Sequence, residues 1–519
     1  MRHIHAGITV LAAIFAVSTP AQPLRMDVVI RNARVLDGSG NPWIRADLGI
    51  SADRIVAVGQ PGTVAAARTI DAHDQFVAPG FIDVHSHAAE GVTNATLRQA
   101  QPLIAQGVTT FVANPDGGGP VDLAAQRATL EKGGLGPNIA LLIGHGSVRN
   151  AVMGQARRDP SPEELDRMGE LVRRAMREGA FGLSSGLFYT PGSYARTEEV
   201  IALARAAAEF GGVYTSHVRD EGNYSVGVVA SVQEVIRIAD EAHTIGIVSH
   251  MKALGHDSWG LSGALLQQID AARRRGVQVF ADQYPYDASA TSLRAALLPN
   301  GVAPDLAVVR DNLRRRGGPE SILISFYRAD PSVQGKTLAE VARERGVLAE
   351  QAALDLIAGG SASIVSFNMS EDDIAAIMKA PYTMASSDGA LVPVGAGHPH
   401  PRDYGAFARR LAVYVRQKHV VGLEFAIRSM TSLPAEVFRI EDRGVIRPGA
   451  YADLVIFDPD RVRDAATYAD PQRLAEGVSW VLVNGVVVRA DGQFTEALPG
   501  RVLRPPPAQP IKGPEREAR

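Results

Sequence analysis

Residues 79–87 read PGFIDVHSH, a short apolar strand that runs into two histidines one residue apart. Phe81 to Val84 is typical of a buried strand, and His85 and His87 follow it directly. Alternate side chains of an extended segment point to the same side, so both imidazoles can bind a single metal ion. This segment predicts a buried strand with a metal-binding pair of histidines at its carboxyl end.

Seven further apolar runs resemble this strand, and stretches with helical periodicity such as Glu163–Arg177 separate them. The runs are Thr109–Ala113, Ile139–Ile143, Phe181–Leu183, Val213–Ser216, Ile247–Ser249, Val277–Ala281 and Tyr382–Ser386. Eight strands that alternate with helices predict an α/β fold of the (β/α)8 barrel type. A doubly wound open sheet is the alternative.

Both ends of the chain predict a smaller β domain. Alternating strands occupy Asp27–Asn32, Ala46–Ile50 and Arg54–Val58, and again Ala452–Phe457, Val478–Val483 and Gly485–Arg489, with the hairpin pair Asn484-Gly485 between the last two. Each set alone has too few strands to form a stable domain, so we expect one domain built from residues 22–78 and 436–500.

The barrel itself is expected at residues 79–435. Its last two strands are separated by far more chain than a crossover needs, which predicts an inserted helical subdomain at about 290–365. Residues 501–519 are rich in proline and charge and are predicted to be a disordered tail.

Residues 1–21 resemble an export signal. Arg2 precedes the apolar run Ala6–Val17, and Thr19-Pro20-Ala21 offers small residues for cleavage. The run is too short to span a bilayer, so we expect cleavage and no stable membrane anchor. In a bacterium this places the mature protein in the periplasm or outside the cell.

Composition narrows the classes of function. The chain has 519 residues, 53 Lys+Arg and 56 Asp+Glu, and its formal net charge of −3 argues against nucleic acid as a partner. It contains no cysteine, which excludes disulfides, thiolate nucleophiles and cysteine-based metal sites. Any metal must be held by His, Asp or Glu. The oligomeric state is left open.

Polar residues follow most of the predicted strands. Besides His85 and His87, they are Asp116, His145, His217, His250 and Asp388. In a barrel these strand ends converge on one mouth. Imidazoles and carboxylates bind Zn²⁺ and leave a position open for water, and a nearby carboxylate can move the proton. The set predicts hydrolysis of an amide or a related bond in a small-molecule substrate.

The same motifs resemble those of the amidohydrolase superfamily and, more closely, of the D-aminoacylases. The matching segments run from about Asp27 to Gly492 and include PGFIDVHSH at 79–87, GVTT at 107–110, GHG at 144–146, GLSSGL at 182–187, HVRDEG at 217–222, SHMK at 249–252, DQYPY at 282–286, SDG at 387–389 and HPHPR at 398–402. An ordered series of this length is much more specific than the HxH pair alone.

The resemblance implies a distorted TIM-like barrel, a β-sandwich formed by both chain ends, and one or two Zn²⁺ ions. His85 and His87 would hold one ion, His217 and His250 a second, and Asp388 would be the general acid/base and a possible ligand. The residues implied near the substrate are Lys252, Tyr284, Ser289 and Arg402. Arg402 is expected to pair with an α-carboxylate. His145, Arg219 and Glu221 are expected to support the metal ligands.

Asp116 is a departure from the family pattern, which often has a bridging cysteine at this point. The segment here reads Asn114-Pro115-Asp116-Gly117. Asp116 is therefore predicted to replace the thiolate as a metal ligand, and the alternative is that it only shapes a turn. The loop between Asp388 and Arg402 is also slightly longer than usual.

These features favour a metal-dependent hydrolase of N-acyl-D-amino acids or of dipeptides that end in a D-residue. Cyclic-amide hydrolysis is an alternative, but its enzymes commonly carboxylate a lysine after the fourth strand. FGLSSG at 181–186 has none, and no lysine occurs between Lys132 and Lys252. A non-catalytic periplasmic binding protein is the third hypothesis, and the full set of ligand residues argues against it.

Overall fold

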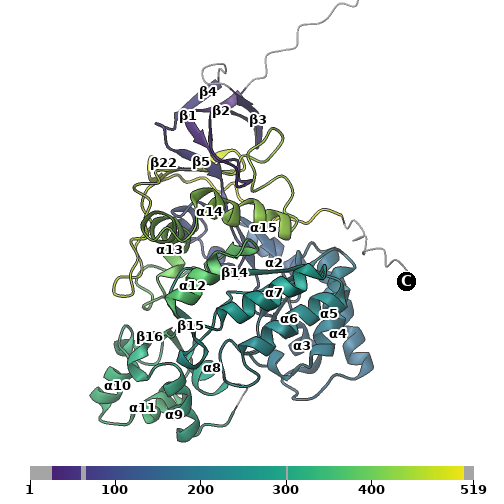
Figure 1. Cartoon of the computed structure of the whole chain (residues 1–519), viewed down its shortest axis with the longest axis vertical. Coiled ribbons are helices and arrows are strands. Elements are labelled where there is room, and N and C mark those ends of the chain that lie inside the picture. Colours follow the sequence, from purple (N-terminus) through teal and green to yellow (C-terminus); the bar gives the residue numbers. More distant parts are fainter. Residues whose placement is uncertain (1–25, 60–65, 300–301, 508–519) are drawn as a thin grey trace, which may run out of the picture.

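The computed structural model describes residues 26–59, 66–299 and 302–507 (Figure 1). The predicted signal, residues 1–21, lies outside the described residues. Within the described ranges, no helix combines the length and the apolar character needed to cross a membrane.

Parallel strands at the centre of the molecule form the predicted barrel-like sheet. In order they are β6 (Phe81–Asp83), β8 (Val108–Ala113), β9 (Asn138–Leu141), which β10 (Ile143–Gly144) continues, β11 (Gly182–Gly186), β12 (Val213–His217), β13 (Gly246–Val248), β14 (Val279–Gln283) and β18 (Thr383–Ala385). Hydrogen bonds join β6-β8-β9 and β10-β11-β12-β13-β14-β18. The distorted (β/α)8 arrangement is therefore confirmed, although backbone hydrogen bonds do not close it into a full barrel.

Helices cover the outside of this sheet. On the right of Figure 1 lie α3 (His145–Met153), α4 (Pro162–Arg177), α5 (Thr197–Ala208), α6 (Val228–Ala242) and α7 (Ser262–Arg274). The others are α1 (Gln101–Ile104), α2 (Leu123–Glu131), α12 (Glu371–Met378), α13 (Arg402–Arg409), a π-helix (Arg410–Gln417), α14 (Leu423–Met430) and α15 (Ser432–Val437).

The first and last strands of the sheet are joined at their carboxyl ends. The two-residue strands that follow them, β7 (Ser86–His87) and β19 (Gly389–Ala390), pair in parallel. The buried Asp83 carboxylate accepts the Ser387 N–H at 2.9 Å, and the Asp388 N–H donates to the His85 carbonyl at 2.9 Å. Residues from the two ends of the sheet thus meet at the mouth.

The opposite end of the sheet is filled with apolar side chains. Phe181, Val213 and Ile247 lie at the amino ends of their strands and share a buried cluster with Leu433 and Phe438 from α15 and its end. Because this end is packed, the mouth is left as the place for a site.

The chain ends form one nine-stranded sheet, at the top of Figure 1. Its strands are β1 (Met26–Val35), β2 (Ile44–Ser51), β3 (Arg54–Gly59), β4 (Ala66–Asp71), β5 (Phe76–Pro79), β20 (Leu454–Phe457), β21 (Val478–Val483), β22 (Val486–Ala490) and β23 (Gln493–Phe494). β5 pairs with β20, which joins the two ends as predicted. The expected sandwich is instead one continuous hydrogen-bonded sheet, because the long β1 pairs with β2 on one side and with both β4 and β5 on the other.

An inserted unit separates β14 from β18 and lies at the bottom of Figure 1. It contains the antiparallel sheet β15 (Ala288–Ser292), β17 (Ala362–Phe367) and β16 (Ile322–Tyr327) and the helices α8 (Leu293–Leu297), α9 (Leu306–Arg315), α10 (Leu338–Arg345) and α11 (Ala349–Ala358). It has an apolar core of its own. The inserted subdomain expected at about 290–365 is present, but the expectation that it is helical was wrong in part: ASIVSF forms β17, which pairs with β15 on one side and with β16, ILISFY, on the other.

The prediction of a disordered tail at 501–519 was wrong for residues 501–503, which are hydrogen-bonded to the barrel. The Leu503 N–H donates to the Ile139 carbonyl at 2.7 Å, and the guanidinium of Arg127 donates to the Val502 carbonyl at 2.6 Å. Residues 501–503 therefore pack along β9, because free backbone groups there complete the hydrogen bonding of an edge. Residues 508–519 lie outside the described residues.

Candidate metal centre and active site

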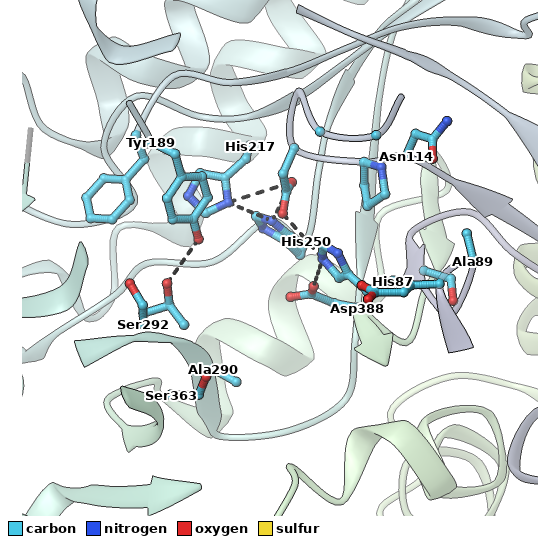
Figure 2. A pocket seen from close by; sticks show the side chains of 18 of the residues that line it. His87, Ala89, Asn114, Tyr189, His217, His250, Ala290, Ser292, Ser363 and Asp388 are labelled. Atoms are coloured by element: carbon cyan, nitrogen blue, oxygen red, sulfur yellow. Dashed lines mark hydrogen bonds and ion pairs between the residues drawn. The ribbon is translucent and has the colours of Figure 1, made fainter. Parts of the chain in front are cut away.

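Six potential metal ligands meet at the mouth of the barrel, and Figure 2 labels four of them, His87, His217, His250 and Asp388. Each follows or ends a strand: His85 and His87 follow β6, Asp116 follows β8, His217 ends β12, His250 follows β13 and Asp388 follows β18. Strand geometry alone brings them together, because the carboxyl ends of parallel strands share one edge.

Asp116 lies among the imidazoles. Its Oδ1 is 3.4 Å from His85 Nε2, 3.5 Å from His250 Nε2 and 3.9 Å from His217 Nδ1. Its other oxygen, Oδ2, is 3.4 Å from His87 Nε2. One carboxylate thus faces all four histidines, which a residue that only shapes a turn would not need to do.

Asp388 connects the histidines to a cation. Its Oδ1 lies 3.2 Å from His87 Nε2 and 3.6 Å from His85 Nε2, and its Oδ2 lies 2.7 Å from the Arg402 guanidinium. Burial raises the pKa of Asp388, but the charges of Arg402 and His250 outweigh it and hold that pKa well below the usual value. The carboxylate is therefore ionised at neutral pH and able to accept a proton.

Glu221, which was expected to support the metal ligands, lies in direct contact with one of the histidines. Its Oε1 is 3.0 Å from His250 Nδ1 and 4.0 Å from His217 Nδ1, and it forms an ion pair with Lys252. Burial raises the pKa of Glu221, but the Lys252 charge outweighs it and the net pKa is lowered. Glu221 both contacts His250 and has the position of a possible ligand.

The donor set fits a divalent metal such as Zn²⁺. Three buried atoms, His85 Nε2, His217 Nε2 and Asp116 Oδ1, have no hydrogen-bond partner in the described part of the chain, which is costly unless something else binds them. Two groups have ligand atoms within 4.8 Å of one another: His85, Asp116, His250 and Asp388, and His217, Glu221 and His250. Nitrogen and oxygen donors in such groups suit one or two zinc ions.

The charge of the site also favours a cation. Burial and Lys252 lower the pKa of His250, but Asp388 and Glu221 outweigh them and raise it to about 10. Burial lowers the pKa of His217 to about 4. The carboxylates therefore stabilise positive charge at the centre, where a metal ion and a proton compete for the same imidazole.

Three of the candidate ligands have a strained backbone. Asp116, His250 and Asp388 have φ values of 56°, 34° and 49°, in the left-handed region that side chains rarely adopt. The turn at Asp116 is also tightly packed, because a Cβ on Gly117 would lie 2.9 Å from the Gly186 nitrogen. Such strain persists where the surrounding fold enforces it, which is common at functional sites.

A pocket of about 1010 Å³ opens over the cluster and is lined by the barrel mouth and the inserted unit. Lys252, Tyr284, Ser289 and Arg402, all predicted near the substrate, line it. The Lys252 ammonium is 2.8 Å from His250 Nδ1, and the Arg402 guanidinium lies 4.7 Å from the centre of the Tyr284 ring. A cationic, aromatic wall therefore adjoins the metal ligands.

A sequence model of the amidohydrolase family matches residues 68–489. The chain belongs to the amidohydrolase family. It is 36% identical to the N-acyl-D-glutamate deacylase of Alcaligenes xylosoxydans xylosoxydans, over 92% of this chain and 97% of the relative.

Two solved structures extend this finding. The N-acyl-D-glutamate deacylase of Bordetella bronchiseptica, in complex with zinc and a phosphonate mimic of the tetrahedral intermediate, gives a TM-score of 0.82 at 36% identity, covering 92% of this chain and all of that one. A D-aminoacylase studied for its binuclear metal centre gives 0.82 at 34% identity with the same coverage. The L-hydantoinase of Arthrobacter aurescens, with a TM-score of 0.61 at 17% identity, shares the fold alone. The predicted membership of the D-aminoacylase group is confirmed.

Two residues expected to support the ligands of this amidohydrolase are engaged elsewhere. Arg219 pairs with Glu234 at 2.8 Å and donates to two loop carbonyls, so its guanidinium is already satisfied. His145 Nε2 lies 2.9 Å from Glu199, which also pairs with Arg149. Within the described residues neither side chain has a hydrogen bond or ion pair with the six ligand candidates, so this prediction was wrong for both.

Tyr189 is a residue of the amidohydrolase pocket that sequence reasoning missed. Tyr189 lines the pocket, its ring centre is 4.7 Å from that of His217, and its hydroxyl is 3.2 Å from Thr291 Oγ1 of the inserted unit (Figure 2). Its position three residues after β11 was a usable signal, because residues that follow barrel strands face the mouth.

Proposed function

We propose that this amidohydrolase removes the acyl group from N-acyl-D-amino acids and releases the free D-amino acid. The observation that carries the proposal is the double contact of Asp388, which touches two histidines with one oxygen and Arg402 with the other. This contact puts a proton-transfer group between the metal ligands and a cation suited to a carboxylate. In an N-acyl amino acid the amide to be cleaved is close to the α-carboxylate, so the amide can lie at the metal ligands while the carboxylate reaches Arg402.

The residues that would hold Zn²⁺ are His85, His87, His217 and His250, with Asp116 among them. Bound Zn²⁺ supplies a Lewis acid that polarises the amide carbonyl and lowers the pKa of water. The proposal allows one or two ions, because His250 belongs to both groups of possible ligands.

Asp388 is proposed to move the proton. As an ionised carboxylate it can accept a proton from the attacking water and then donate it to the amide nitrogen as the amine leaves. Arg402, stacked near Tyr284, is proposed to bind the substrate α-carboxylate through its planar guanidinium. Lys252 and Ser289 would complete that contact.

The test is a matched set of substrates. Zinc-loaded protein should release free amino acid from N-acetyl-D-glutamate and N-acetyl-D-leucine, and not from their L enantiomers. An L,D-dipeptide shows whether a longer acyl group is accepted, and dihydrouracil tests the cyclic-amide alternative. Absence of release from every D substrate, or equal release from L substrates, would overturn the proposal.

Two variants distinguish a loss of catalysis from a loss of folded protein. Asp388→Asn should abolish most of the release, while Asp372→Asn, at an exposed position on α12, should leave it unchanged. Equal activity of both variants would remove Asp388 from the reaction.

We further propose that the chain is exported and acts in the periplasm or outside the cell. The support is the signal-like composition of residues 1–21. Amino-terminal sequencing of protein recovered from periplasmic and cytoplasmic fractions tests this. An intact Met1 in protein found only in the cytoplasm would contradict it.

A further inference from the structure

One cation of the substrate pocket has no anionic partner among the residues that the structure describes. Arg316 directly follows α9 in the inserted unit, is only 2% exposed and lines the pocket. Its Nε donates to the Ala296 carbonyl at 3.4 Å, and one Nη donates to the Asn368 side-chain oxygen at 3.0 Å. Within the described residues, no carboxylate oxygen lies within 4.0 Å of its guanidinium.

The other two cations of the pocket are already neutralised. Lys252 pairs with Glu221, and Arg402 pairs with Asp388 at 2.7 Å. A guanidinium stays charged at any physiological pH, and burying it without an anion costs free energy. Arg316 is therefore the cation in this pocket that a ligand carboxylate would satisfy best.

The surroundings of Arg316 are polar and come largely from the inserted unit. Ser289, Ser325 and Ser363 of the inserted unit line the pocket with it, and Asn368 contacts both Arg316 and Ser289 Oγ, the latter at 3.1 Å. Figure 2 shows Ser363 and Ser292 across the cavity from Asp388. Hydroxyl donors beside a guanidinium suit an anion rather than an apolar side chain.

We propose that Arg316 binds a carboxylate in the side chain of the substrate, so that the preferred substrates are N-acyl derivatives of acidic D-amino acids. This inference rests on the proposed deacylase function. The two carboxylates of such a substrate would then have separate partners: Arg402 binds the α-carboxylate beside Asp388, and Arg316 binds the side-chain carboxylate on the wall of the inserted unit.

The test compares substrates that differ only in charge. N-acetyl-D-glutamate and N-acetyl-D-glutamine have nearly the same shape, and zinc-loaded wild-type protein should show a kcat/KM at least about 100-fold higher for the acid, as expected for a buried charge pair. Arg316→Gln should remove most of this preference by lowering kcat/KM for the acid about 100-fold and for the amide by at most a few-fold. Arg314→Gln, at an exposed arginine in the last turn of α9 and two residues before Arg316, should keep the wild-type preference.

Each outcome bears on the inference. If wild-type protein cleaves N-acetyl-D-glutamine with the same kcat/KM as N-acetyl-D-glutamate, the inference is wrong while the deacylase function stands. This comparison uses wild-type protein alone, so it decides the question even if Arg316→Gln does not fold. An equal loss on both substrates in a folded Arg316→Gln protein, judged by circular dichroism, would assign Arg316 to the α-carboxylate or to structure. No hydrolysis of either substrate would refute the deacylase function itself.

Discussion

Replacing Asp116 by Asn tests the least familiar feature of the site. The substitution keeps the size of the side chain, and Asn tolerates the left-handed backbone that Asp116 adopts at φ 56°. It also keeps the turn, since Asn is as good a turn residue as Asp. The one property removed is the negative charge that faces four imidazole nitrogens at 3.4 to 3.9 Å.

The expected effect is a large loss of metal affinity. Partners that only orient a ligand are worth 10- to 100-fold in metal affinity. A carboxylate placed among all four histidines should be worth at least the upper value, about 100-fold or 2.8 kcal/mol. If Asp116 served only the turn, the same substitution would change metal affinity and stability very little.

Elemental analysis after dialysis, together with competition against a chelating dye, measures the affinity. Asp116→Cys is the matched variant, because it places a thiolate where related enzymes often carry one, and it should retain metal with a shift toward softer ions. Wild-type metal content and kcat/KM in Asp116→Asn would refute the reasoning and reduce Asp116 to a turn residue.

Four further outcomes are expected. Asp388→Asn should lower kcat about 100-fold or more while most metal is retained, measured by steady-state kinetics and elemental analysis. Arg402→Ala should lower kcat/KM for N-acyl-D-amino acids far more than for the matching α-amides, and equal losses would make its role structural. Removal of metal by a strong chelator should abolish hydrolysis and lower Tm, with recovery on adding Zn²⁺, because metal bound only by the folded state stabilises it. Burial raises the pKa of Asp403 to about 7, so the folded wild type holds a proton that the unfolded chain releases at lower pH, and its stability falls as pH rises from about 4 to about 7. Asp403→Asn cannot ionise and avoids this loss. The Tm of the variant, measured relative to that of the wild type, should therefore increase between pH 5 and pH 8.

The barrel and its ligands were predictable because their signals are local. The histidines of the PGFIDVHSH segment, Asp116 and Asp388 each follow a short apolar run. Parallel strands bring such positions to one mouth of the barrel, whatever the length and conformation of the loops. The Asn484-Gly485 hairpin was predictable for the same reason, and both residues have the positive φ, 49° and 78°, that this turn requires.

Other features depended on contacts that no local pattern reveals. Arg219 lies two residues from His217, yet its guanidinium is directed to Glu234 by a pairing that only the packed α6 provides. Arg316 stands in the segment RRRGG, residues 314–318, which reads as an exposed basic turn. Its burial in the pocket follows from how the inserted unit docks on the barrel, and the docking of a long insertion is not encoded in nearby residues.

The pairing of β7 with β19 has a consequence for the order of folding. Ser86 and Gly389, which meet in it, are 303 residues apart in the chain. Contacts so distant in sequence form late, because the entropy of closing the intervening chain must be overcome first. During synthesis His85 emerges long before Asp388, so the ligand set is incomplete until about three-quarters of the chain has been made. The group of ligands that includes Asp388 is therefore completed late in folding, whereas the group formed by His217, Glu221 and His250 does not wait for Asp388.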